Sequence, residues 1–71
     1  MQRPIEKYGW GYSGINNELE TEVFKRSVYV MNIYKDGSVN ISNSNLKFNM
    51  FEFEELQAIY KTAEQIRKEN E

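Results

Sequence analysis

The sequence predicts a small α+β domain, in which an antiparallel sheet of three to four strands is packed by one C-terminal amphipathic helix. Two β-rich runs flank Asp36-Gly37, a dipeptide that is typical of hairpin turns. Further along, apolar residues recur every three or four positions from about residue 50 to residue 68. This is the periodicity of a helix with one apolar face.

The chain is short enough to form a single domain over residues 1–71, with a β-meander over 1–48 and the helix, frayed at its end, over 49–71. A domain of this size buries only about 60% of the surface that its unfolded chain exposes. The sequence contains neither Cys nor His, so neither a disulfide nor a structural zinc site is expected to reinforce the core. Small domains without such reinforcement often gain stability by oligomerising, and we therefore expect a homodimer.

The predicted helix has a start signal, an apolar stripe and charges that complement its dipole. Asn49 is a good N-cap, and Glu52 three residues later completes a pattern that resembles a capping box. Glutamates gather in the first turns, whereas Arg67 and Lys68 fall in the last turn, as the helix dipole favours. The expected apolar stripe consists of Phe53, Leu56, Ile59, Tyr60, Ala63 and Ile66.

The register of the hairpin follows from the side chains that each turn would bring together. A two-residue loop would pair Asn32 with Ile41 and mix polar with apolar side chains on one face. A three-residue loop with a left-handed Gly37 pairs Ile33 with Val39 and separates the two kinds, so we predict this loop. The apolar face would then carry Tyr29, Met31, Ile33, Val39 and Ile41, and the polar face Asn32, Tyr34, Ser38, Asn40 and Ser42.

Upstream of the hairpin the pattern is weaker. Residues 18–23 alternate between polar and apolar types, which favours a half-exposed strand, although the apolar positions would also suit a short helix. Residues 13–17 are typical of a turn. Residues 8–12 alternate aromatic with glycine, and as a strand they would place three rings on one face. Residues 46–48 are expected to form a short final strand or to lead directly into the helix.

Charge is weak and unevenly distributed. The net charge is −2, with residues 1–48 at +1 and residues 49–71 at −3. A nearly neutral sheet creates no strong field that would steer the chain to nucleic acid. No apolar run approaches the roughly 20 residues of a membrane span, and no signal peptide is visible, so a cytoplasmic protein without a membrane partner is expected.

The sequence lacks most of the side chains on which catalysis depends. Without His or Cys it has no general base suited to neutral pH and no thiol nucleophile, and its serines have no imidazole partner. No Gly-rich loop has the Lys-Ser/Thr needed to bind phosphates. Glu52 and Glu55 share a helical face, but a solvated first turn accounts for them. We therefore expect no catalytic residue, metal site, cofactor or enzymatic activity.

Three surfaces are candidates for binding, each with a structural alternative. The aromatic rings of residues 8–12 would offer a stacking platform to a base or a partner side chain, or would simply fill the core. The polar hairpin face would be an adaptable binding surface or an ordinary solvated face. The acidic first turn of the helix would mimic phosphate, or merely complement the helix dipole. The candidate site residues are Tyr8, Trp10, Tyr12, Asn32, Tyr34, Lys35, Asn40, Glu52 and Glu55.

The segment from Val28 to Arg67 is expected to run strand, strand, lead-in and helix, with Lys47-Phe48-Asn49 and Phe53-Glu54-Glu55-Leu56 at the lead-in. This order resembles the single-strand DNA-binding domain of the positive-cofactor family of transcriptional coactivators, in which a curved sheet precedes a helix that mediates dimerisation. The resemblance implies a dimer that binds single-stranded DNA. Because that family's sheet is basic and this one is nearly neutral, single-strand binding is kept as an alternative.

A non-catalytic protein-binding module is the leading hypothesis for function. Many phage and mobile-element proteins that inhibit host enzymes or defence systems are also short, acidic and without catalytic groups, so an inhibitor of this type is expected. A protein that sequesters a nucleotide or other small ligand would need a pocket bounded by Tyr8, Trp10, Tyr12 or Tyr34. A nucleic-acid binder would need convergence of the basic residues Lys7, Lys25, Arg26, Lys35 and Lys47.

Overall fold

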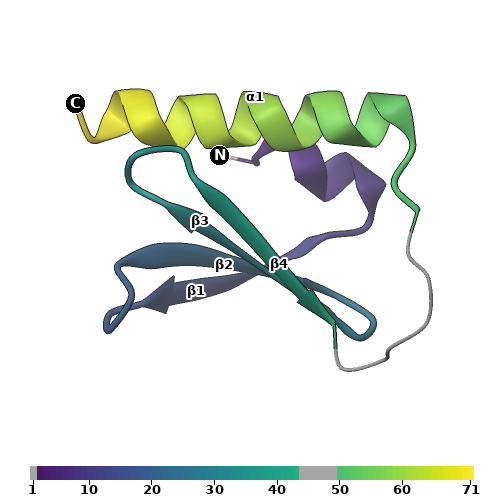
Figure 1. The fold of residues 1–71 in the computed structure, drawn as a ribbon, viewed down its shortest axis with the longest axis horizontal. Helices are drawn as coiled ribbons and strands as arrows, with labels where there is room; N and C mark the ends of the chain where they lie inside the picture. The colour runs from purple at the N-terminus through teal and green to yellow at the C-terminus, as the bar shows by residue number, and fades with distance from the viewer. Residues whose placement is uncertain (1, 44–49) are drawn as a thin grey trace.

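The chain folds as a four-stranded sheet with one face covered by helices. The computed structural model describes residues 2–43 and 50–71. The strands pair in chain order and are all antiparallel, and α1 and η1 lie together on one side of them (Figure 1). This arrangement confirms the predicted α+β fold class. The elements are the 3-10 helix η1 (Pro4–Tyr8), the strands β1 (Gly11–Asn16), β2 (Thr21–Arg26), β3 (Tyr29–Tyr34) and β4 (Val39–Asn43), and the helix α1 (Phe53–Glu69).

The β3–β4 hairpin has the predicted register. The backbone N–H of Tyr34 donates to the carbonyl of Ser38 at 2.8 Å, and the N–H of Gly37 donates to the carbonyl of Tyr34 at 2.9 Å. Gly37 has a φ of +89°, in the left-handed region that the three-residue loop requires, so this prediction is confirmed. The apolar residues pair as expected, Met31 with Ile41 and Ile33 with Val39.

The core lies between α1, η1 and the covered face of the sheet. Thr62 joins the two helices, because its buried hydroxyl accepts the N–H of Ile5 at 3.2 Å and donates to the carbonyl of Ala58 at 2.8 Å. Partly buried Ile41, Tyr29 and Phe51 pack against the core from its edge. The buried apolar residues are Ile5, Trp10, Phe24, Met31, Ile33, Ala58, Ile59, Ala63 and Ile66.

The helix begins later than predicted. It starts at Phe53, with Glu52 at the N-cap position in an extended conformation, so the predicted start at residue 50 is wrong. Asn49, the predicted N-cap, and the expected strand or lead-in over 46–48 lie outside the described residues. At the other end α1 reaches Glu69, one residue beyond the predicted limit.

The buried face of α1 also differs from the predicted stripe. Ile59, Ala63 and Ile66 are buried as expected, whereas Phe53, Leu56 and Tyr60 are exposed. The places of these three are taken by side chains around the other side of the helix. These positions turn inward because the N-terminal chain packs there, and sequence periodicity did not anticipate that contact. The residues buried in place of the predicted ones are Glu55, Ala58 and Thr62.

The N-terminal segment is not the aromatic strand that the sequence suggested. Pro4 begins η1, a position that suits its fixed φ, and Gly9 ends it with a φ of +88°. The chain therefore turns before β1 starts at Gly11, so the prediction of a strand over residues 8–12 is wrong for residues 8–10 and holds for Gly11 and Tyr12.

The first hairpin is shifted relative to its prediction. Residues 13–16 lie within β1, where the register with β2 slips between Tyr12 and Ile15, so the turn predicted over 13–17 is wrong there. Gly14, with a φ of +93°, belongs to this β-bulge rather than to the hairpin turn. The expected strand over 18–23 forms later, as β2, after a turn at residues 17–20.

Candidate functional site

Trp10 and Glu55, two of the candidate residues, belong to a buried cluster. The indole Nε1 of Trp10 donates to Glu55 Oε1 at 2.9 Å, and Arg26 Nη1 lies 2.6 Å from the same oxygen. The Arg26 guanidinium also covers the indole ring, 4.6 Å from its centroid. Because Trp10 is 1% exposed and Glu55 6% exposed, this cluster anchors α1 to β2 and is closed to a ligand.

The other two rings of the expected platform lie apart from Trp10. Tyr8 sits in η1 with its ring partly exposed, and Arg26 Nη1 donates to its carbonyl at 2.9 Å. Tyr12 is half-exposed in β1 and meets Phe24 edge-on at 5.5 Å between ring centroids. The structure therefore does not bring the rings of residues 8, 10 and 12 together as one platform.

The polar hairpin face lies on the side of the sheet that α1 leaves open. Asn32 is half-buried there and accepts a hydrogen bond from the Thr21 hydroxyl at 2.8 Å. Asn40 lies opposite Asn32 and is exposed, and Tyr34 is half-buried opposite Thr21. The face is uncharged at these positions, as the sequence suggested, and two members of it, Asn32 and Ser42, are already hydrogen-bonded through their side chains.

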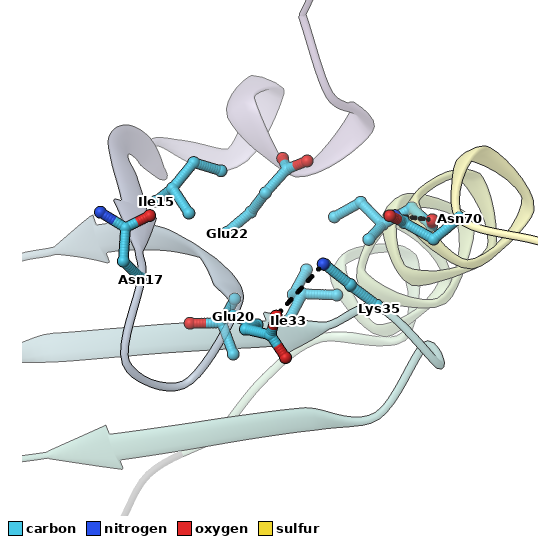
Figure 2. Close-up of a pocket in the computed structure, with 9 residues that line it drawn as sticks. Ile15, Asn17, Glu20, Glu22, Ile33, Lys35 and Asn70 are labelled. Atoms are coloured by element: carbon cyan, nitrogen blue, oxygen red, sulfur yellow. Dashed lines mark hydrogen bonds and ion pairs between the residues drawn. The ribbon is translucent and has the colours of Figure 1, made fainter.

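Lys35 lines a hollow at the C-terminal end of α1 (Figure 2). Its floor is apolar, with Ile15, Ile33 and Ile66, and the Lys35 amino group reaches across the rim to Glu20 at 3.5 Å. Both partners of this ion pair are mostly exposed, so it contributes little stability. The hollow measures about 210 Å³, below the roughly 300 Å³ of typical small-molecule sites, and none of the four predicted aromatic residues lines it.

Arg3 makes a charged network that ties the N-terminal chain to both the sheet and α1. Its guanidinium lies 2.6 Å from a carboxylate oxygen of Glu69 and 2.7 Å from one of Glu22, and it donates to the Gln65 amide oxygen at 3.3 Å. Hydrogen bonds to Glu69 and then Glu22 raise the pKa of Arg3, and the same contact lowers the pKa of Glu69. This network joins the N-terminal chain to β2 and to the C-terminal end of α1, beside a hollow of about 440 Å³ that Tyr12 also lines.

The described basic residues do not converge on one surface. Lys25 and Arg26 are neighbours in β2 and point to opposite faces, with Arg26 held by Glu55. Lys35 lies beyond the other end of β3, beside Glu20. Lys47 lies outside the described residues. The basic residues of β2 and of the β3–β4 turn, within the described part of the chain, form no continuous stripe of the kind that single-stranded nucleic acid follows.

The sequence reasoning missed one surface, which we call the apolar flank: Phe53, Leu56 and Tyr60 of α1. Their spacing of three and four places them on one side of the helix. They are 50–69% exposed, and Met50 just before the helix is 77% exposed. Glu52, the remaining candidate, is exposed beside them at the N-cap position. Helical periodicity predicts the three side chains of the flank but places them in the core, and that prediction is wrong.

The apolar flank lies on the β4 side of α1. Tyr60 lines a shallow hollow together with Asp36 and Gly37 of the β3–β4 turn. On the opposite side of the helix, Lys61 and Gln57 line a hollow with η1. One side of α1 is therefore closed by η1 and Arg3, and the other side is apolar and uncovered by the described residues.

Comparisons and searches for known chemistry give no assignment. No protein-family model, curated protein or solved structure matches the chain. Over residues 2–43 and 50–71, no three acidic side chains gather as metal ligands would. Within the same ranges, no helix is both long enough and apolar enough to cross a bilayer. Functional proposals therefore rest on the surfaces described above.

Proposed function

We propose that the chain is a non-catalytic protein-binding module and that its docking face is the apolar flank of α1. The observation that carries this proposal is the exposure of Phe53, Leu56 and Tyr60 in a domain whose core side chains are almost fully buried. Burying one such side chain is worth about 1.5–3 kcal/mol, so a partner that covers all three gains substantial affinity. Contiguous apolar patches of this kind mark protein interaction sites.

The composition of the flank supports a protein rather than a charged ligand as its occupant. The three side chains include two aromatic rings, which are frequent anchors of protein interfaces. We further propose that the chain is a cytoplasmic inhibitor of the phage type. This part of the proposal rests on the short, acidic composition alone. Catalysis forms no part of the proposal, because the sequence has no His or Cys.

Matched substitutions test the docking face. Leu56→Gln removes apolar surface from the flank, whereas Leu19→Gln removes it from the β1–β2 turn, where Leu19 is 46% exposed against 50% for Leu56. Wild type and both variants are immobilised, partners from source cells are identified by mass spectrometry, and binding is measured again with purified components. We expect Leu56→Gln to weaken binding at least tenfold and Leu19→Gln to leave it unchanged. Equal binding by all three chains would refute the proposal.

A further inference from the structure

We infer that the partner of the apolar flank is a second copy of this chain, joined to the first by antiparallel pairing of β4 with β4. The inference deepens the proposed function and rests on it, because it names the occupant of the docking face. It predicts one continuous eight-stranded sheet with both α1 helices on the same face. Two features support this inference: the edge strand β4 is regular and uncharged, and the apolar flank lies on the same side of the molecule.

The two edge strands of the sheet differ in how well they are protected against pairing. β1 is interrupted by the bulge between Tyr12 and Ile15, a common device that prevents edge-to-edge association. β4 is regularly paired to β3 along its length. It has no Pro, no Lys and no charged side chain among its five residues, Val39–Asn43. Of the two edges, β4 is therefore the one able to accept another strand.

The backbone of β4 presents bonding groups outward at alternate residues. Ser38 accepts from Tyr34, so it faces β3, and antiparallel geometry turns Asn40 and Ser42 the same way. The N–H and C=O groups of Val39 and Ile41 then point away from β3. A second β4 centred on Ile41 places Ile41 opposite its own copy and Asn40 opposite Ser42 of the second copy.

The apolar flank makes this pairing specific for a copy of the chain. Antiparallel pairing of two identical strands places a two-fold axis perpendicular to the sheet, so both helices lie on one face. Each flank lies on the β4 side of its own helix, so the two flanks face each other above the joined strands. Val39, which is 36% exposed on the same face, is covered in the same step.

Charge also favours a second copy over a charged partner. Neither β4 nor the apolar flank contains an ionisable acid or base other than the Tyr60 phenol. Along β4 a partner of opposite charge would find nothing to attract it, and two copies meet there without like-charge repulsion, whereas the carboxylates of Glu52 and Glu64 lie beside the flank of each helix. The net charge of −2 is carried elsewhere on the chain.

Two double variants at exposed positions of β4 test this register, because their charges repel or attract across the seam only if Asn40 lies opposite Ser42 of the second copy. In the inferred dimer, the variant Asn40→Lys/Ser42→Lys places Lys opposite Lys twice, and Asn40→Lys/Ser42→Glu places Lys opposite Glu twice. Both variants change the same exposed positions. Light scattering and sedimentation equilibrium should show a wild-type dimer, a dissociation constant raised at least tenfold by the Lys/Lys variant, and little change in the Lys/Glu variant.

Disulfide trapping provides a second readout, because the chain has no native cysteine. A mixture of Asn40→Cys and Ser42→Cys chains should oxidise to a covalent dimer much faster than either variant alone, since these positions lie about 4.5 Å apart between Cα atoms in the inferred pair. Ser13→Cys chains, with the thiol on β1, should not be trapped.

Each outcome separates this inference from the proposed function. A chain that stays monomeric up to about 1 mM, or a dimer that both double variants weaken equally, overturns the β4 pairing. If Leu56→Gln still abolishes binding of another protein in that case, the proposed function stands alone. If the dimer forms through β4 and Leu56→Gln leaves its dissociation constant unchanged, the flank is not part of the seam and this inference fails, whereas the proposed function is still decided by whether Leu56→Gln weakens binding of another protein.

Discussion

The two sides of α1 differ in how the rest of the chain treats them. On the η1 side, Glu55 and Thr62 are buried and hydrogen-bonded to partners from the N-terminal chain, and Arg3 closes the end of the helix. On the β4 side, Leu56 and Tyr60 are large, apolar and exposed. The same helix therefore buries carboxylate and hydroxyl groups while it leaves aromatic and aliphatic groups in water. The hydrophobicity of the helix residues alone does not decide which face is buried. The face that is buried is the one against which the N-terminal chain packs.

The largest expected loss of stability comes from a substitution on the η1 side of α1, which we call the closed side; the β4 side, with Leu56 and Tyr60, is the open side. Trp10→Ala removes the largest fully buried side chain, the indole that donates to Glu55 and lies under the Arg26 guanidinium. We expect a loss of about 3–5 kcal/mol in the free energy of unfolding, enough to unfold much of a domain this small. Urea denaturation followed by circular dichroism measures it. A loss below about 1 kcal/mol would show that the cluster does not anchor α1 to β2.

The β3–β4 turn lies against the C-terminal half of α1, and glycine substitutions report on that contact. A Cβ at Gly37 would lie 3.4 Å from the Arg67 side chain and 3.5 Å from the Ala63 carbonyl, whereas a Cβ at Gly14 would meet nothing within 4 Å. Both glycines have a φ near +90° and so share the backbone cost of about 1–3 kcal/mol.

Gly37→Val should therefore destabilise the chain more than Gly14→Val does, by about 1 kcal/mol. Thermal or chemical denaturation of both variants provides the comparison. Equal losses would mean that the turn does not press on the helix. Tyr34→Ala, on the open sheet face, should spare folding and serve to test binding by the polar hairpin surface.

Acid should weaken the closed side through the Arg3 network. The hydrogen bond from Arg3 lowers the pKa of Glu69 below its unfolded value, so the pair stabilises the fold above pH about 4.5 and this contribution is lost as pH falls through the lowered pKa. Glu69→Gln should be less stable than wild type at pH 7, and the difference should disappear near pH 3. Denaturation at several pH values measures the stability difference between wild type and Glu69→Gln. A difference that stays constant from pH 7 to about pH 3 would show that the Arg3–Glu69 pair does not stabilise the fold.

Asp36 adds a similar but local effect at the turn. The backbone N–H of Ser38 donates to its carboxylate at 2.9 Å and lowers its pKa, so its contribution is also present at neutral pH and lost in acid. The raised pKa of Arg3 has no consequence in this window, because the guanidinium stays charged throughout it.

The smallest expected effect on stability is on the open side. Leu56→Gln changes an exposed residue with no buried polar group left behind, so the free energy of unfolding of the monomer should move by less than about 0.5 kcal/mol. Ile59 lies three residues further along the same helix and is buried, so Ile59→Gln should lower the free energy of unfolding several times more. Equal costs for the two would mean that Leu56 is covered.

The sequence was sufficient wherever the deciding interactions are local. Alternation around Asp36-Gly37 specified the hairpin register, because a slip of one residue would have exchanged the faces of both strands. The existence of α1 followed from its periodicity and charges. The rotation of α1 did not, because it depends on five residues of η1 that pack against it from the far end of the sequence.

The candidate residues show the same limit. Trp10 and Glu55 looked like binding groups because each was judged without its partner, and tertiary structure supplies that partner in the form of Arg26. Phe53 and Tyr60 looked like core because helical spacing cannot tell which apolar residues another element will cover. Periodicity identifies faces, and only the packed chain identifies which face is buried.

The central claim is that the open side of α1 is an interface. Sedimentation equilibrium of wild type, Leu56→Gln and Leu19→Gln over a range from about 1 μM to 1 mM tests it most directly. We expect a reversible dimer for wild type and Leu19→Gln and a dissociation constant raised at least tenfold for Leu56→Gln. A Leu56→Gln chain that associates as tightly as Leu19→Gln would contradict it.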